Sequence, residues 1–183
     1  MVARSIIPFC IIALVSISWA AEPEIVELNS MVVVGLQSLI SMKDNVISEL
    51  WTRLEQTGCE IENPTIPGVY FGVSWGYQEQ TKGDMSSARF FHMVGAPVDS
   101  LGDLPEGFTF KNIPAHRYAK FIHQGSIKKL MDTYNHIFME WLPNSEYLYH
   151  ETATDIEWYD HRFKGEGEDS EFDIYIPVIE KTK

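Results

Sequence analysis

The sequence is poor in positive charge. Its 183 residues include 14 Lys and Arg against 26 Asp and Glu, which gives a formal net charge of −12 at pH 7. No cluster of Lys and Arg stands out, because the pair Lys128-Lys129 is too small to form a basic patch. An acidic surface repels phosphate groups, so we expect no nucleic-acid partner and favour neutral or cationic ones.

Cysteine is scarce as well, and the only two are Cys10 and Cys59. Cys10 lies in a segment that we expect to be removed, so Cys59 stands alone and no internal disulfide is expected. The stretch HETAT, residues 150–154, lacks the second histidine of the HExxH zinc motif. The histidines are scattered along the chain: His92, His116, His123, His136, His150 and His161. We therefore predict no metal and no cofactor, with haem binding as an open alternative.

The apolar run near the N-terminus is too short to span a bilayer comfortably, since a spanning helix needs about 20 residues. It has the layout of a secretory signal peptide, in which Arg4 precedes IIPFCIIALV and small residues at Ser18 and Ala20 follow. We expect cleavage after Ala20 and export to the periplasm or outside the cell. The mature protein is not expected to insert stably into a membrane, and an uncleaved anchor is the alternative.

The remaining chain, residues 21–183, is predicted to be one domain of two similar halves. Residues 24–98 and residues 104–179 each read strand, strand, helix, strand, strand, and the turn-rich linker 99–107 joins them. We read this as a weak internal duplication. The predicted class is α+β with βαββ-like halves, where one helix per half covers a sheet and a groove lies between the halves.

Both helices are predicted from apolar residues at helical spacing. The first is expected within residues 43–58 and the second within residues 126–143, where Ser126 can cap the start and Pro143 the end. The apolar positions in the two helices are Val46, Ile47, Leu50, Trp51 and Leu54, then Ile127, Leu130, Met131, Tyr134, Ile137, Phe138 and Trp141.

A carboxylate stands within DIEWYDHRF, residues 155–163, which otherwise reads as a strand. In the last strand, alternate apolar residues from Phe172 to Val178 should lie under a helix. If Ile156 and Trp158 also face the helix, a second surface carries Glu157, Tyr159, Asp173 and Tyr175. One interpretation is an ordinary solvated face. The other is a ligand groove, where aromatic walls desolvate the carboxylate, raise its pKa and attract cations.

GVSWG, residues 72–76, matches the G-x-S-x-G pattern around Ser74, which marks the nucleophile of α/β-hydrolases at a strand-to-helix elbow. The residues that follow have no apolar helical face. We therefore interpret the stretch as a strand whose glycines let a ligand or backbone approach closely, with Trp75 as a candidate groove wall. Tyr118, in RYAKF, is another strand aromatic, and alternation does not decide which face it occupies.

Three stretches together resemble the GyrI-like small-molecule-binding domain, also called the effector-binding domain of AraC-type regulators. They are the segment from LPEGFTFKNIP to WLPNSEY, then DIEWYDHRF, then DSEFDIYIPV. The resemblance is strong over residues 104–179 and weaker over residues 24–98. It implies two βαββ halves related by pseudo-twofold symmetry, with a groove where an acidic residue among aromatics meets cationic lipophilic ligands.

On this resemblance, Glu157 matches the groove carboxylate, and Asp173 stands where many relatives have Glu. We expect an exported protein that binds a small organic molecule, cationic or aromatic. Glu157 would be the main anchor and Asp173 a second, with Tyr159, Tyr175, Trp75 and Tyr118 as walls. The alternatives are a hydrolase of electrophilic compounds with Glu157 as general base, a haem binder related to SOUL proteins, and a protein-interaction module. The sequence shows no helix-turn-helix segment, so DNA binding is not expected.

Overall fold

The computed structural model describes residues 22–41, 43, 46–57, 61–78 and 89–182. The predicted signal segment, Cys10, Cys59 and most of the polar loop at residues 76–88 lie outside the described residues. The strands are β1 (Glu24–Leu28), β2 (Met31–Ser41), β3 (Tyr70–Gln78), β4 (Arg89–Val98), β5 (Thr109–Ile113), β6 (His116–Gln124), β7 (Tyr147–Tyr149), β8 (Asp155–Tyr159) and β9 (Glu171–Glu180).

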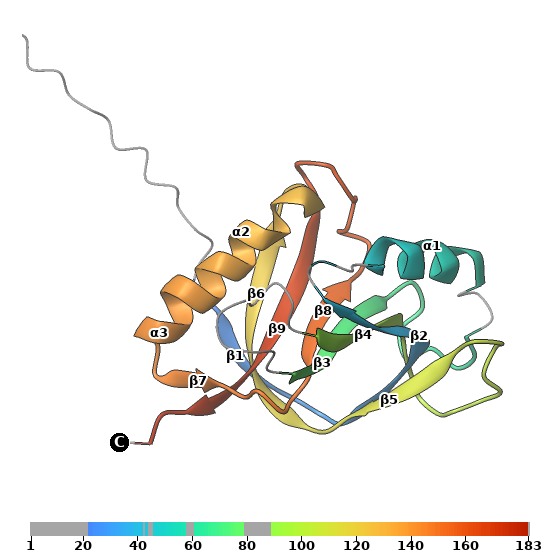
Figure 1. Cartoon of the computed structure of the whole chain (residues 1–183), viewed down its shortest axis with the longest axis horizontal. Coiled ribbons are helices and arrows are strands. Elements are labelled where there is room, and N and C mark those ends of the chain that lie inside the picture. Colours follow the sequence, from blue (N-terminus) through green and yellow to red (C-terminus); the bar gives the residue numbers. More distant parts are fainter. Residues whose placement is uncertain (1–21, 42, 44–45, 58–60, 79–88, 183) are drawn as a thin grey trace, which may run out of the picture.

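The described strands form one antiparallel sheet in the order β1-β6-β9-β8-β3-β4-β2-β5, with β7 paired to the end of β9. Only residues 29–30 join β1 to β2, and only residues 114–115 join β5 to β6, although each pair lies near opposite edges of the sheet. The sheet must therefore curl strongly, as Figure 1 shows. The predicted α+β class is confirmed, and the strand order is symmetric about the β8-β3 pair. The internal duplication itself stays a prediction.

The first helix, α1 (Ile47–Thr57), begins and ends close to the predicted bounds. Leu50 and Leu54 are buried and pack with Val94 and Ala96 of β4. These contacts follow from the apolar spacing, because residues four apart lie on one face of a helix.

The second helical segment consists of a 3₁₀ turn (Ile127–Lys129), α2 (Leu130–Asn135), a π-helical stretch (His136–Trp141) and α3 (Leu142–Asn144). Ser126 caps its start, as predicted, by accepting a hydrogen bond from the backbone N–H of Lys128. Pro143 lies within the last turn and does not end the helix. Met131 was predicted to face the core, but it is half exposed, because the buried face is centred on Leu130, Tyr134 and Ile137.

Both helices pack on the same face of the sheet. In Figure 1 they lie apart, with α2 on the left, α1 on the right, and β8 and β3 seen between them. The other face curls around a second apolar core. Its fully buried members include Val33, Phe71, Val73, Met93, Tyr118 and Ile156. Since both faces of the sheet carry apolar side chains, hydrophobicity alone does not decide which residues of a strand face the helices and which face the curled core.

Candidate functional site

The register of β8 against β9 separates the four residues that we predicted to share one surface. Glu157 lies opposite Ile174, whereas Trp158 lies opposite Asp173. Glu157 and Tyr159 therefore face the helices, and Asp173 and Tyr175 face the curled core. The prediction of a common surface is wrong because Ile156 and Trp158 pack into the curled core and not under a helix.

The Glu157 carboxylate is held by two tyrosine hydroxyls from different elements. Tyr134 of α2 donates a hydrogen bond to Oε1 at 2.7 Å, and Tyr159 of β8 donates one to Oε2 at 2.7 Å. On the neighbouring strand, Gly72 lies opposite Glu157, and a Cβ there would come within 2.8 Å of Oε2. The missing side chain of Gly72 thus makes room for the carboxylate.

The site lies at the seam between the two helices. Trp51 of α1 contacts the apolar cores under both helices, and its ring meets that of Tyr159 edge-on at 5.0 Å between centroids. The Tyr134 ring stacks on Phe138 at 6.3 Å. Helical spacing in the sequence predicted Trp51 and Tyr134 only as helix-core residues. The hydroxyl of Tyr134, on a core-facing position of the helix, was the signal that this residue has a polar partner, because a buried Tyr O–H usually needs one.

Burial dominates the electrostatics at Glu157. The side chain is only partly accessible to solvent, and burial raises its pKa, although the hydrogen bonds from Tyr134 and Tyr159 act in the opposite direction. Burial and the adjacent carboxylate also raise the pKa of Tyr159 well above its usual value. A carboxylate in such surroundings is stabilised by a cation or by further hydrogen-bond donors.

We expect Glu157→Gln to stabilise the ligand-free protein by about 1 kcal/mol at pH 7, the usual scale of a single substitution. A raised pKa in the folded state means that ionisation costs the native protein free energy. Stability should therefore fall as pH rises from about 4 through the raised pKa, and the variant should lack this decline. Urea unfolding of both proteins between pH 4 and pH 8 measures the difference. An identical pH dependence in the two proteins would contradict it.

The other predicted site residues do not line this seam. Tyr118 and Tyr175 are buried in the curled core, where their rings meet edge-on at 6.2 Å. Trp75 packs against the same core, stacks on Phe91 at 5.5 Å and has Lys111 Nζ 4.9 Å from its ring centroid. Ser74 lies within β3 and not at a strand-to-helix elbow, so it lacks the setting of a hydrolase nucleophile.

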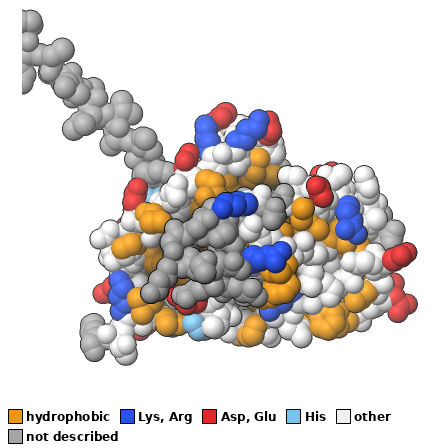
Figure 2. All heavy atoms as spheres, viewed as in Figure 1, with side chains coloured by type: hydrophobic (Ala, Val, Ile, Leu, Met, Phe, Trp, Pro, Cys, Tyr) orange, Lys and Arg blue, Asp and Glu red, His pale blue; other side chains and the backbone are white. Residues whose placement is uncertain are grey.

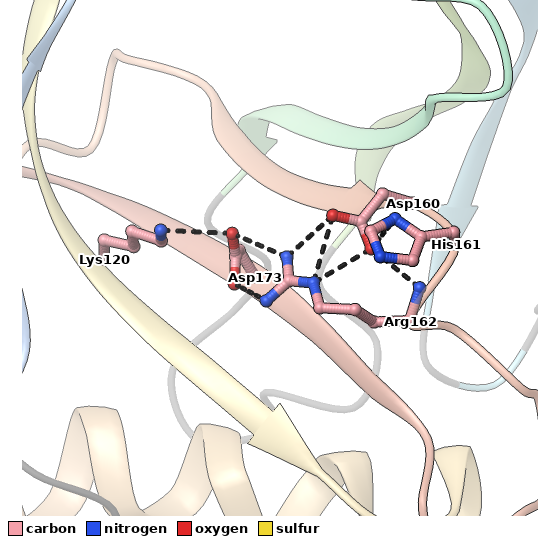
Figure 3. A network of polar contacts seen from close by, with 5 residues as sticks. All are labelled: Lys120, Asp160, His161, Arg162 and Asp173. Carbon is pink, nitrogen blue, oxygen red and sulfur yellow. Dashed lines mark hydrogen bonds and ion pairs between the residues drawn. The ribbon is translucent and has the colours of Figure 1, made fainter.

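Asp173 belongs to an ion-pair network on the face opposite Glu157 (Figure 3). Arg162 contacts both of its oxygens, with distances of 3.1 Å from Nη1 and 3.0 Å from Nη2, and Lys120 Nζ lies 3.2 Å from Oδ2. The Nε of Arg162 also donates to both oxygens of Asp160. The two acids, Asp160 and Asp173, are paired with two cations, Arg162 and Lys120. This balance of charge indicates that the network stabilises the fold and does not favour Asp173 as a ligand anchor.

The described surface offers little else that resembles a chemical centre. Two shallow hollows lie beside Trp141 and Tyr147, and beside Val69 and Ala96; neither is lined by Glu157. The described residues contain no group of three His, Cys, Asp or Glu side chains placed to hold a metal ion. They also contain no helix that is long and apolar enough to cross a bilayer. In the view of Figure 2, acidic and basic side chains alternate with separate apolar patches.

The sequence and the fold both have known counterparts. The transcriptional regulator BrlR of Pseudomonas aeruginosa is 30% identical over 155 residues, which cover 84% of this chain and 54% of that protein. The chain therefore spans about half the length of this curated relative.

Two solved structures show the same fold at low identity. SAV2435 bound to tetraphenylphosphonium gives a TM-score of 0.66 at 17% identity, covering 86% of this chain and 94% of that one. The C-terminal domain of EcmrR gives 0.60 at 16% identity, covering 87% and 98%. Residues 21–179 match the GyrI-like small molecule binding domain. This chain thus belongs to the GyrI-like family of small-molecule-binding domains.

Proposed function

We propose that the protein binds an aromatic or lipophilic organic cation at Glu157. The observation that carries this proposal is a partly buried carboxylate held by two tyrosine hydroxyls at the seam between α1 and α2. A desolvated carboxylate favours a cationic partner, and the rings of Trp51, Tyr134 and Tyr159 add cation–π attraction and apolar contact area. The tetraphenylphosphonium bound to SAV2435 supports this ligand class.

The two tyrosine hydrogen bonds leave the carboxylate able to bind more. Each carboxylate oxygen can accept two hydrogen bonds, and one tyrosine donates to each. Tyr134 and Tyr159 already donate to the carboxylate, so we expect a large ligand to displace at least one of these hydroxyls. Tyr134 is on a helix next to a π-helical stretch, and it is the side chain that we expect to move. The free energy needed for this displacement lowers the affinity for the ligand.

We also place the mature protein outside the cytoplasm, on the layout of residues 1–20. Mass spectrometry of protein purified from the periplasm or the medium should find Ala21 as the first residue. Finding the full chain in the cytoplasm would contradict export without affecting the ligand proposal.

Tetraphenylphosphonium tests the ligand proposal because it carries charge and rings but no hydrogen-bond donor. We expect it to bind and to raise the melting temperature, whereas neutral triphenylphosphine oxide should bind much more weakly. Glu157→Gln should weaken binding of the cation about 10- to 100-fold, since Coulomb attraction between opposite charges in a partly desolvated site is worth a few kcal/mol, part of which is offset by desolvation. Isothermal titration calorimetry measures both affinities.

Glu151→Gln is the matched control, because Glu151 is exposed in the loop after β7 and carries the same charge. This variant should bind the cation as the wild type does. An equal loss of affinity in the two variants would mean that the effect comes from the overall charge of the protein, and it would overturn the proposal. Turnover of an activated ester that disappears only in Glu157→Gln would instead favour the hydrolase alternative.

A further inference from the structure

A buried histidine lies beside Glu157 and has an unused ring nitrogen. His92 of β4 is 3% exposed and lies opposite Ser74 of β3. Its Nδ1 is 2.9 Å from Ser74 Oγ, whereas its buried Nε2 has no hydrogen-bond partner within the described part of the chain. A buried polar atom without a partner costs free energy, and such atoms often mark a functional position.

The position of Gly72 shows how near this ring comes to the carboxylate. Ser74, Gly72 and Glu157 face the same side of the sheet, because Gly72 lies opposite Glu157 and is two residues from Ser74. A Cβ built on Gly72 would be 2.8 Å from Glu157 Oε2 and 3.4 Å from His92 Cε1. Nε2 is bonded to that Cε1. The imidazole edge and the carboxylate therefore flank one point, with no side chain on Gly72 to separate them.

The ring is suited to accept a hydrogen bond at Nε2. Burial lowers the pKa of His92 to about 4, so the imidazole is neutral near pH 7 and does not repel a cation. The Ser74 hydroxyl can accept a hydrogen bond from Nδ1–H, and in that tautomer Nε2 is an acceptor. The same low pKa makes His92 a poor general base near neutrality, which argues against a catalytic Ser74–His92 pair.

We propose that His92 makes the site selective for organic cations that carry N–H groups, such as protonated amines and amidines, over quaternary cations. One N–H of the cation would donate to Glu157 on one side of Gly72, and a second N–H would donate to His92 Nε2 on the other. A quaternary nitrogen satisfies the charge of Glu157 but leaves Nε2 without a partner, and unsatisfied polar groups discriminate strongly between ligands. This inference rests on the proposed function, because it assigns the ligand class at the same site.

The test compares N-methylbenzylamine, which is protonated at pH 7 and then carries two N–H groups, with benzyltrimethylammonium. The two cations differ by two N–H groups against two N–CH₃ groups. We expect wild-type protein to bind the N–H cation about tenfold more tightly, as measured by NMR titration. His92→Phe should reduce this ratio several-fold, because the N–H cation loses one of its two acceptors and the quaternary cation loses none; the hydrogen bond to Glu157 accounts for the preference that remains.

Two further variants keep the test sound if His92→Phe fails to fold. A glutamine places its amide near the position of Nε2, so His92→Gln should retain part of the selectivity that His92→Phe loses. His92→Asn, whose amide lies near Nδ1, should not. His161→Phe is the control for the substitution itself, because that side chain is 90% exposed, and it should leave the ratio unchanged.

The outcomes separate this inference from the proposed function. Equal binding of both cations by the wild type, together with a loss in Glu157→Gln, would overturn the role of His92 and leave the cation site standing. Selectivity that survives undiminished in His92→Asn would also overturn it. Failure of both cations and of tetraphenylphosphonium to bind would remove the proposed function itself.

Discussion

Gly35→Ala is expected to destabilise the protein by about 3 kcal/mol or more, which is severe for a single added methyl group. Gly35 of β2 lies directly opposite Gly95 of β4. A Cβ on Gly35 would be 2.1 Å from the Val94 carbonyl oxygen and 2.7 Å from Gly95 Cα. These are backbone atoms, so no side-chain rotation relieves the clash and the strands must separate. Chemical denaturation followed by circular dichroism measures the loss.

Gly68→Ala provides the comparison for this effect. Gly68 has a φ of +78°, but no atom lies within 4 Å of the position of its Cβ. The substitution should therefore cost only the backbone strain of the left-handed region, about 1–2 kcal/mol. A loss in Gly35→Ala no larger than that in Gly68→Ala would show that β2 and β4 are not in close contact here. Because β4 carries His92, a variant of Gly35 that still folds should also have altered surroundings at His92 and at the proposed cation site.

Arg162→Ala is expected to destabilise the protein by about 2–3 kcal/mol. Removing one partner of a buried ion pair costs roughly 3–5 kcal/mol, and this figure is reduced here because the Arg162 side chain is 28% exposed. The variant leaves Asp173, whose side chain is 6% exposed, with Lys120 as its remaining cationic contact in the network of Figure 3. Urea unfolding at pH 7 gives the change in the free energy of unfolding.

The same variant should respond differently to acid. Hydrogen bonds from Arg162 lower the pKa of Asp160. Asp160 therefore contributes stability that is complete above its unfolded pKa, near 4, and is lost as pH falls through the lower folded value. The difference between wild type and Arg162→Ala should be constant above about pH 4 and shrink below it.

Arg117→Ala is the matched control for Arg162→Ala. Arg117 also contacts two carboxylates, those of Glu27 and Glu180, but both of these acids are about two-thirds exposed. Its loss should cost much less than the loss of Arg162, because ion pairs at the surface contribute little to stability. Equal losses in the two arginine variants would mean that Asp173 is better solvated than the structure indicates.

The class of fold and both helices could be predicted from the sequence, because the signals are local. Leu50 and Leu54, or Tyr134 and Ile137, recur within one stretch of chain and need no knowledge of distant partners. The alternation from Phe172 to Val178 likewise predicted a face under a helix correctly. The curl of the sheet was not predictable in this way, since it results from pairings such as β1 with β6.

The site was predicted in part. The structure keeps the predicted pair Glu157 and Tyr159 together but puts Asp173 and Tyr175 on the other face, because alternation relates residues within one strand only; the role of Glu157 in binding stays a prediction. Which face β8 presents depends on its register with β9, in which Glu157 lies opposite Ile174. Trp51, Gly72 and His92 come from segments far from Glu157 in the chain, and no local pattern links them to it.

The interlocked order of the strands also constrains when the chain can acquire its structure. Among the described strands, β1 pairs only with β6, and β9 joins β6 to β8. Until residues 171–180 have left the ribosome, the sheet exists at best as two disconnected pieces. Long-range pairing of this kind slows folding. The nascent chain therefore cannot complete its sheet until residues 171–180 have been synthesised.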